Sequence, residues 1–117
     1  MTQAQAPQIL QDPLYQILRD ENVKDFNTAR STGGAIDLRG GDFRGLDLRG
    51  LDAHGLDLSN AYFRGADLRG IDFSHTRLEG ASLAGANISG CYFPKELSAD
   101  ELLLSLNHGT RMRYNTP

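Results

Sequence analysis

The sequence predicts an all-β solenoid with helical caps at both ends. Three observations lead to this prediction: an apolar residue recurs at every fifth position from Leu38 to Phe93, a glycine usually follows two positions later, and both flanks carry helical patterns. A strict period of five fits neither the 3.6-residue period of a helix nor the two-residue alternation of a long strand. Each five-residue unit therefore predicts a short extended edge followed by a turn.

Twelve such units run without a shift of frame over residues 36–95. In one-letter code they read IDLRG, GDFRG, LDLRG, LDAHG, LDLSN, AYFRG, ADLRG, IDFSH, TRLEG, ASLAG, ANISG and CYFPK. The first and third residues of a unit point to the same side of an extended segment, and here they are apolar or small. Glycine or Asn60 ends most units, and both tolerate the positive φ that a type II turn requires. Four edges predict one coil of twenty residues, and the twelve units predict about three coils.

The repeated unit resembles the motif A(D/N)LXX of the pentapeptide repeat family, and the resemblance covers about half of the chain. It implies a right-handed quadrilateral β-helix. In that fold the central Leu or Phe and the small residue two positions earlier fill the interior. The departures are an undersized centre at Ala53, Arg77 in place of Asp, and His75 and Lys95 in place of Gly.

Residues twenty apart are expected to stack in columns on the four faces of the coils. The phenylalanines then fall in two opposite columns, Phe43 with Phe63 and Phe73 with Phe93. We expect Phe73 to lie over Ala53, which leaves the first coil less well filled there.

Both flanks carry the helix signals expected of solenoid caps, which cover the apolar edges of the first and last coils. Asp12 followed by Pro13 predicts a helix start, and Asn22 predicts the start of a second short helix. At the other end Ser98 and Glu101 fit a capping box, and Gly109 predicts a helix stop. The predicted division is a disordered tail (1–11), an N-terminal helical cap and linker (12–35), the β-helix (36–95), and a C-terminal capping helix and tail (96–117).

Four leucines of the C-terminal helix, Leu102, Leu103, Leu104 and Leu106, cover more than one helical stripe. One interpretation is that all four seal the last coil. The other is that part of the set stays exposed and makes a homodimer contact. The sequence leaves both open.

Composition argues against several classes of protein. The net charge of −3 lacks the basic excess of a nucleic-acid binder, so direct nucleic-acid binding is not expected. The single cysteine, Cys91, excludes an internal disulfide. No apolar run approaches the roughly 20 residues of a membrane span, and no secretion signal is apparent. We expect a cytoplasmic protein of bacterial type that does not bind membranes.

No pattern in the sequence indicates catalysis or cofactor binding. The recurring Asp residues sit beside arginines and are interpreted as a solvated ladder that also binds turn amides. His54 and His75 fall one coil apart, but no third ligand is apparent and Cys91 is expected to point inward, so no metal site is predicted. Nucleophile motifs, phosphate loops and zinc spacings are absent, so we predict no catalytic, cofactor-binding or metal residues and no enzyme.

One corner of the surface is a candidate partner site. Arg44 and Arg64 are predicted to stack on one face, Arg49 and Arg69 on the next, with Tyr62 among them. Arg and Tyr are enriched at binding hot spots. The competing interpretation is an ordinary exposed salt-bridge ladder that contributes little to stability.

The function predicted from these features is a non-catalytic protein-interaction or scaffold module whose protein partner is unknown. The alternative, implied by the quinolone-resistance members of the family, is a DNA mimic that binds DNA gyrase or another topoisomerase. Residues 36–95 contain eight acidic and seven basic side chains, so the surface alternates in sign. Because a mimic needs a continuous negative potential, the alternative ranks second.

Overall fold

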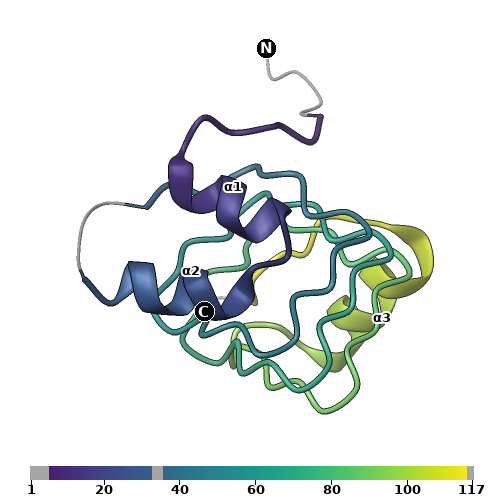
Figure 1. Cartoon of the computed structure of the whole chain (residues 1–117). Coiled ribbons are helices and arrows are strands. Elements are labelled where there is room, and N and C mark those ends of the chain that lie inside the picture. Colours follow the sequence, from purple (N-terminus) through teal and green to yellow (C-terminus); the bar gives the residue numbers. More distant parts are fainter. Residues whose placement is uncertain (1–5, 33–35, 116–117) are drawn as a thin grey trace.

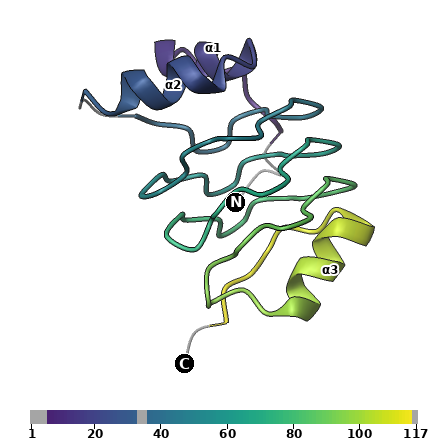
Figure 2. The same ribbon diagram turned by 60° about the horizontal axis from the view of Figure 1, so that its bottom comes forward.

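The computed structural model describes residues 6–32 and 36–115. Helices α1 (Pro13–Arg19) and α2 (Val23–Arg30) come first, the coiled repeat region follows, and helix α3 (Ala99–His108) comes last. The coils are stacked between the α1–α2 pair at one end and α3 at the other (Figures 1 and 2). The chain therefore has the predicted order of cap, repeats and cap.

Successive coils are in register at twenty residues per turn. Parallel bridges join Asp42 to Tyr62 and Tyr62 to Ser82, and four further bridges within the repeats also span twenty residues. The N–H of Leu48 donates to the carbonyl of Asp67 in the next coil at 3.0 Å. We number the faces of the coils by their first units: 36–40 (first), 41–45 (second), 46–50 (third) and 51–55 (fourth).

The predicted β-strands are the part of the fold that differs. Among the described residues, neighbouring coils touch at isolated bridges and no extended strand forms. The physical reason is length, since each edge holds too few residues between turns for consecutive bridges. The turns themselves follow the prediction: Gly40 and Asn60, which end units one coil apart, have φ values of 69° and 61°.

The central residues of the units form the core. Ten of the twelve are buried: Leu38, Phe43, Leu48, Ala53, Leu58, Phe63, Leu68, Phe73, Leu78 and Leu83. The rings of Phe43 and Phe63 stack with centroids 5.4 Å apart, and those of Phe73 and Phe93 with centroids 5.7 Å apart. The two predicted phenylalanine columns are thus confirmed. Each buried Leu or Phe contributes roughly 1.5–3 kcal/mol of hydrophobic stabilisation.

Helices α1 and α2 close the N-terminal end of this core. Oδ1 of Asp12 accepts the N–H of Leu14 at 2.8 Å and caps α1, whose first residue is Pro13. Tyr15 of α1 is buried, and its ring meets the ring of Phe43 edge-on at 5.4 Å. The α2 helix adds the buried Phe26.

The predicted disordered tail over residues 1–11 is wrong for its described part, residues 6–11. The N–H of Gln8 donates to the carbonyl of Gly40 at 3.1 Å, and the carbonyl of Gln8 accepts the N–H of Asp42 at 2.9 Å. The reason is that the outward N–H of Asp42 in the first coil needs an acceptor. Residues 1–5 and 33–35, which belonged to the predicted tail and linker, lie outside the described residues.

Helix α3 begins and ends where the sequence predicts. Oγ of Ser98 accepts the N–H of Glu101 at 3.1 Å, and Gly109 ends the helix with φ of 71°. The capping box is only half formed, because the Glu101 carboxylate accepts hydrogen bonds from Arg113 instead.

The segment after α3 packs on the last coil as far as residue 115. Met112 is 1% exposed. The N–H of Gly80 donates to the carbonyl of Met112 at 2.7 Å, and the N–H of Met112 donates to the carbonyl of Ala81 at 2.9 Å. The segment therefore covers the first face of the last coil in the way that another coil would.

Candidate interaction surfaces

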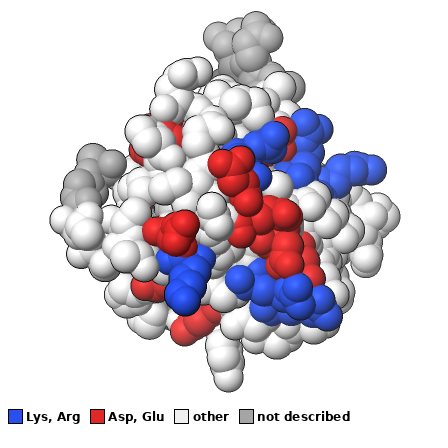
Figure 3. Space-filling model, in the orientation of Figure 1, with Lys and Arg blue, Asp and Glu red and all other residues white. Residues whose placement is uncertain are grey.

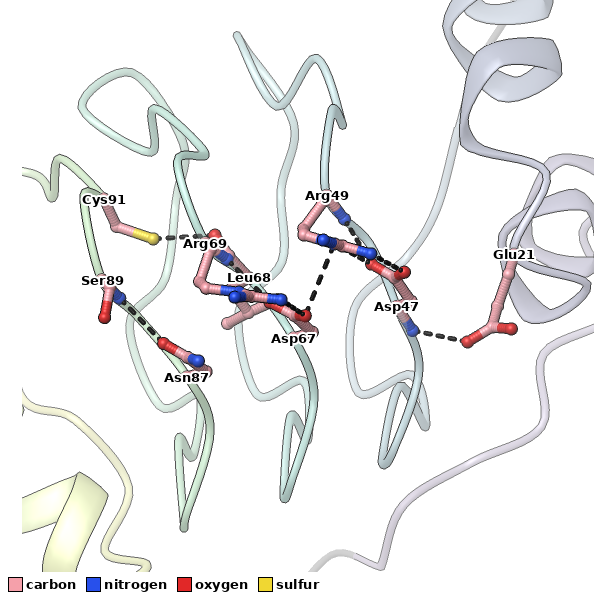
Figure 4. Close-up of polar contacts among 9 residues, drawn as sticks. All are labelled: Glu21, Asp47, Arg49, Asp67, Leu68, Arg69, Asn87, Ser89 and Cys91. Atoms are coloured by element: carbon pink, nitrogen blue, oxygen red, sulfur yellow. Dashed lines mark hydrogen bonds and ion pairs between the residues drawn. The ribbon is translucent and has the colours of Figure 1, made fainter.

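A ladder of ion pairs runs along the third face (Figure 4). Arg49 binds Asp47 of its own unit through Nε and Nη2, at 2.9 and 2.8 Å. Arg69 binds Asp67 of its unit in the same two-point manner, at 2.9 and 2.7 Å. Nε of Arg49 also lies 3.4 Å from Oδ2 of Asp67, which links the two coils. We call these four residues the third-face ladder.

The turn chemistry explains why Asp and Arg recur two positions apart. Oδ1 of Asp47 accepts the backbone N–H of Arg49 at 3.2 Å, and Asp67 accepts that of Arg69 at 3.3 Å. Such a turn, in which Asp binds the backbone two residues on, is common for this side chain. The turn aims the carboxylate at the side chain of the residue two positions later, where an arginine can bind it.

These contacts shift the ionisation of the ladder. The side-chain hydrogen bond from Arg49 lowers the pKa of Asp47 to about 2. The equivalent bond from Arg69 lowers the pKa of Asp67 below its ordinary value. All four groups are therefore charged at neutral pH.

The second face departs from this pattern at one unit. Arg44 binds Asp42 at 2.9 Å through Nε and Nη2, and Arg19 of α1 also lies 3.9 Å from that carboxylate. One coil on, Tyr62 stands where other units have Asp. The exposed Arg64 accordingly has no same-unit carboxylate, and it forms no ion pair within residues 6–32 and 36–115.

Tyr62 instead contacts Arg111 from the C-terminal segment. The guanidinium carbon of Arg111 lies 5.5 Å from the Tyr62 ring centroid, and Nη2 donates to the Tyr62 hydroxyl. Nη1 of Arg111 donates to Oδ1 of Asn60 at 3.3 Å. Sequence reasoning missed Arg111, because the contact joins residues far apart and no repeat position indicates it.

The residues of the predicted corner thus differ in which partners they bind. The bridges from Asp42 to Tyr62 and from Asp47 to Asp67 put the second-face and third-face members at neighbouring positions of adjacent coils. Three of its arginines are bound to Asp in their own units, Tyr62 is bound to Arg111, and Arg64 has no ion pair in the described chain. In Figure 3 acidic and basic side chains lie in adjoining patches of that view rather than in one field of a single sign.

The leucines of α3 divide into two pairs. Leu102 and Leu106 pack against the core, whereas Leu103 and Leu104 are 55% and 38% exposed. Ser105, between Leu104 and Leu106 in the sequence, is buried. Its Oγ accepts the N–H of Leu83 at 2.9 Å and donates to the carbonyl of Thr110 at 2.7 Å. The helix seals the second face of the last coil with one side and leaves two leucines outward.

The N-terminal end of the stack is covered on all four faces. Every second-position N–H of the first coil has an acceptor: Asp12 Oδ2 for Asp37, the Gln8 carbonyl for Asp42, Glu21 Oε2 for Asp47 and Asn27 Oδ1 for Asp52. Asn27 also donates from Nδ2 to the carbonyl of Gly50 at 2.9 Å. The caps thus contribute hydrogen bonds as well as apolar cover.

His54 and His75 lie one coil apart on the fourth face. The rings of His54 and His75 do approach, with centroids 5.1 Å apart. Within the part of the chain that the structure describes, no three His, Cys, Asp or Glu side chains are placed to hold a metal ion. Cys91 is half-buried, its Sγ donates to the carbonyl of Leu68 at 2.8 Å, and burial raises the pKa of its thiol.

Comparison with protein families supports the repeat assignment. A family model described as pentapeptide repeats, with eight copies, matches residues 35–65 and 57–93, which is half of the chain. The chain belongs to the pentapeptide repeat family. As a pentapeptide repeat protein it is a repeat-protein module, and its third-face ladder is built on two repeats that lie one coil apart. Comparison with curated proteins and with solved structures found no match. None of the helices in the described ranges is long and apolar enough to cross a membrane.

Proposed function

We propose that this pentapeptide repeat protein is a non-catalytic protein-interaction module whose partner docks on the corner formed by Arg44, Arg49, Tyr62, Arg64 and Arg69. The observation that carries the proposal is the fixed display of these side chains. Arg44, Arg49 and Arg69 are each held at two points by a carboxylate of their own unit. Groups that are already ordered lose little conformational entropy when a partner binds.

Arg64 supplies the corner with a positive charge that a carboxylate of the partner can bind. It is exposed, and in the described chain no carboxylate lies within ion-pair distance of it. Guanidinium groups bind carboxylates at two points, so the partner segment carries at least one Asp, Glu or terminal carboxylate. The neighbouring ladder alternates in sign, which favours a protein surface of mixed charge over a phosphate backbone.

Three finer assignments belong to the same proposal. Family membership and the twenty-residue register support the right-handed quadrilateral β-helix. The free thiol of Cys91 supports a reducing compartment, the cytoplasm. The exposed Leu103 and Leu104 support a homodimer contact through α3, to which the packed Leu102 and Leu106 do not contribute.

The corner is tested by affinity capture from a lysate of the source cells. The corner variant is Arg49→Glu/Arg64→Glu. The matched control is Arg39→Glu/Arg77→Glu on the first face, where both arginines also bind carboxylates of their own units. A partner captured by the wild type and the control but lost by the corner variant supports the proposal. Equal capture by both variants contradicts it, provided that circular dichroism shows both folded.

The same experiment separates the alternative. Capture of DNA gyrase or another topoisomerase, followed by inhibition of its purified activity, would favour a DNA mimic over the interaction module. The third-face ladder argues against that outcome, because its positive and negative side chains alternate along the stack.

A further inference from the structure

The C-terminal end of the stack is covered on only two of its four faces. On the first face Gly80 donates to the carbonyl of Met112, and on the second Gly85 donates to the carbonyl of Leu106 at 3.0 Å. The equivalent N–H groups on the third and fourth faces belong to Ile88, Gly90 and Phe93. These three donors have no acceptor within residues 6–32 and 36–115.

The register shows that these groups point out of the end. One coil earlier, the N–H of Leu68 donates along the stack to Asn87 at 2.9 Å, and the carbonyl of Ala66 accepts the N–H of Asn87 at 2.9 Å. The corresponding groups of the last coil, the N–H of Ile88 and the carbonyl of Ala86, face the same way with no further coil to meet. The third face therefore ends in an unpaired backbone edge.

Apolar side chains flank this edge. Ile88 and Phe93 are only partly buried, although their counterparts Leu68 and Phe73 in the coil before are fully covered. Tyr92, on the fourth face, is 70% exposed. An edge with free backbone groups and apolar neighbours is a template for another extended chain.

The charges that usually protect such an edge are missing on the third face. Asn87 and Ser89 occupy the positions that Asp67 and Arg69 hold one coil earlier, so the third-face ladder stops before the end (Figure 4). Oδ1 of Asn87 accepts the N–H of Ser89 at 3.2 Å, which keeps the turn without the ion pair. A partner chain can reach the edge without desolvating a charge there.

The protein itself shows what such an edge accepts. Met112 at one end and Gln8 at the other each belong to a single extended segment, and each pairs with a coil edge through both its N–H and its carbonyl. At neither place does a helix or a second coil make this contact. The side chain of Met112 is buried by the pairing.

We propose that the third-face edge of the last coil, from Ala86 to Gly90, binds an extended segment of a partner protein that inserts an apolar side chain over Ile88 and Phe93. The contact is a β-strand addition, in which backbone hydrogen bonds give affinity and the inserted side chain gives selectivity. The Met112 segment pairs with the first face and helix α3 with the second, and no described segment pairs with the third. This edge site is separate from the arginine corner and does not depend on it.

The test selects peptides from a displayed library of random seven-residue segments against the full-length protein. Ile88→Pro removes the donor N–H, and the matched control Ile88→Val keeps it. Selected peptides are expected to carry a central apolar residue and to bind Ile88→Val within about threefold of wild type. They are expected to bind Ile88→Pro at least tenfold more weakly. Binding is also expected to slow hydrogen exchange at the N–H groups of Ile88 and Gly90 in the wild type.

Several outcomes overturn the proposal. Selection that yields no peptide, equal binding to Ile88→Pro, or unchanged exchange at Ile88 and Gly90 would each do so. A wild-type dimer whose third-face edge is already protected from exchange would assign the edge to a second copy instead. If Ile88→Pro does not fold, the exchange measurement on the wild type decides. Peptide binding that survives Arg49→Glu/Arg64→Glu separates this site from the corner.

Discussion

Nε of Arg49 lies 3.4 Å from Oδ2 of Asp67, and this contact joins one coil to the next. Each of the two residues also binds a partner in its own unit, so four side chains form one continuous chain of charges along the third face. Their side chains are partly exposed, and such pairs contribute little to stability. The ladder therefore matters mainly for how it presents arginines to a partner.

Arg49→Gln is expected to raise the pKa of Asp47 from about 2 toward its ordinary value of 3.8. The native value is lowered, so the stabilisation from this carboxylate is complete above pH 3.8 and is lost as the pH falls through about 2. The measurement is an NMR titration of the Asp47 carboxyl carbon. Arg39→Gln, on the first face, is the control and leaves that titration unchanged. A wild-type Asp47 that titrates near 3.8 contradicts the ladder.

Leu68→Ala is expected to lower the free energy of unfolding by roughly 2–5 kcal/mol, because the side chain is fully buried in the middle coil. Urea denaturation followed by circular dichroism measures the change. Leu103→Ala in α3 is the matched control, and its exposed side chain predicts a change within about 0.5 kcal/mol. Similar losses from the two variants would mean that the central residues do not form the core.

Ser105→Ala removes the acceptor of the Leu83 N–H and leaves that buried group unpaired. The expected cost is about 1–3 kcal/mol, measured by urea denaturation. Ser89→Ala removes an exposed hydroxyl in the last coil and is expected to be nearly neutral. A neutral Ser105→Ala would show that α3 is not needed to satisfy the last coil.

Asn27→Ala tests the cap at the other end. The Asn27 side chain accepts from Asp52 and donates to Gly50, so its loss removes two hydrogen bonds and is expected to cost about 1–3 kcal/mol in the free energy of unfolding. Asn22→Ala is the control, since Asn22 makes no side-chain cap bond to α2. Both variants are compared by thermal unfolding, and an equal effect would remove the special role of Asn27.

The period of five predicted the register and the core because side-chain direction in a repeated turn is a local property. Leu68 and Phe73 are buried because they hold the inward third position of their units, as the buried central residues of other units do. Predicting their burial required no knowledge of contacts between distant segments. The predicted strands do not form, because the turns that set the period leave too few residues between them for consecutive bridges.

The end contacts could not be predicted, because they depend on which distant segment reaches the first or last coil. Gln8, Met112 and Arg111 stand outside the repeat, and nothing in their local sequence marks their partners. The pairing of Arg49 with Asp47 could have been predicted more fully, since the Asp-x-Arg spacing within one unit carries the signal. The sequence predicted that four arginines gather at one corner, and the turn geometry places three of them in ion pairs with Asp of their own units.

The coils are stacked in register and capped on all four faces at one end but on only two at the other. Amide hydrogen exchange measured by NMR tests this most directly, at three residues in the same position of their units. Leu68 in the middle coil and Leu83 beneath α3 are expected to exchange slowly, because both N–H groups are bonded. Ile88 is expected to exchange orders of magnitude faster than both. Equal protection of Leu83 and Ile88 would contradict the half-covered C-terminal end, and fast exchange at Leu68 would contradict the in-register stack.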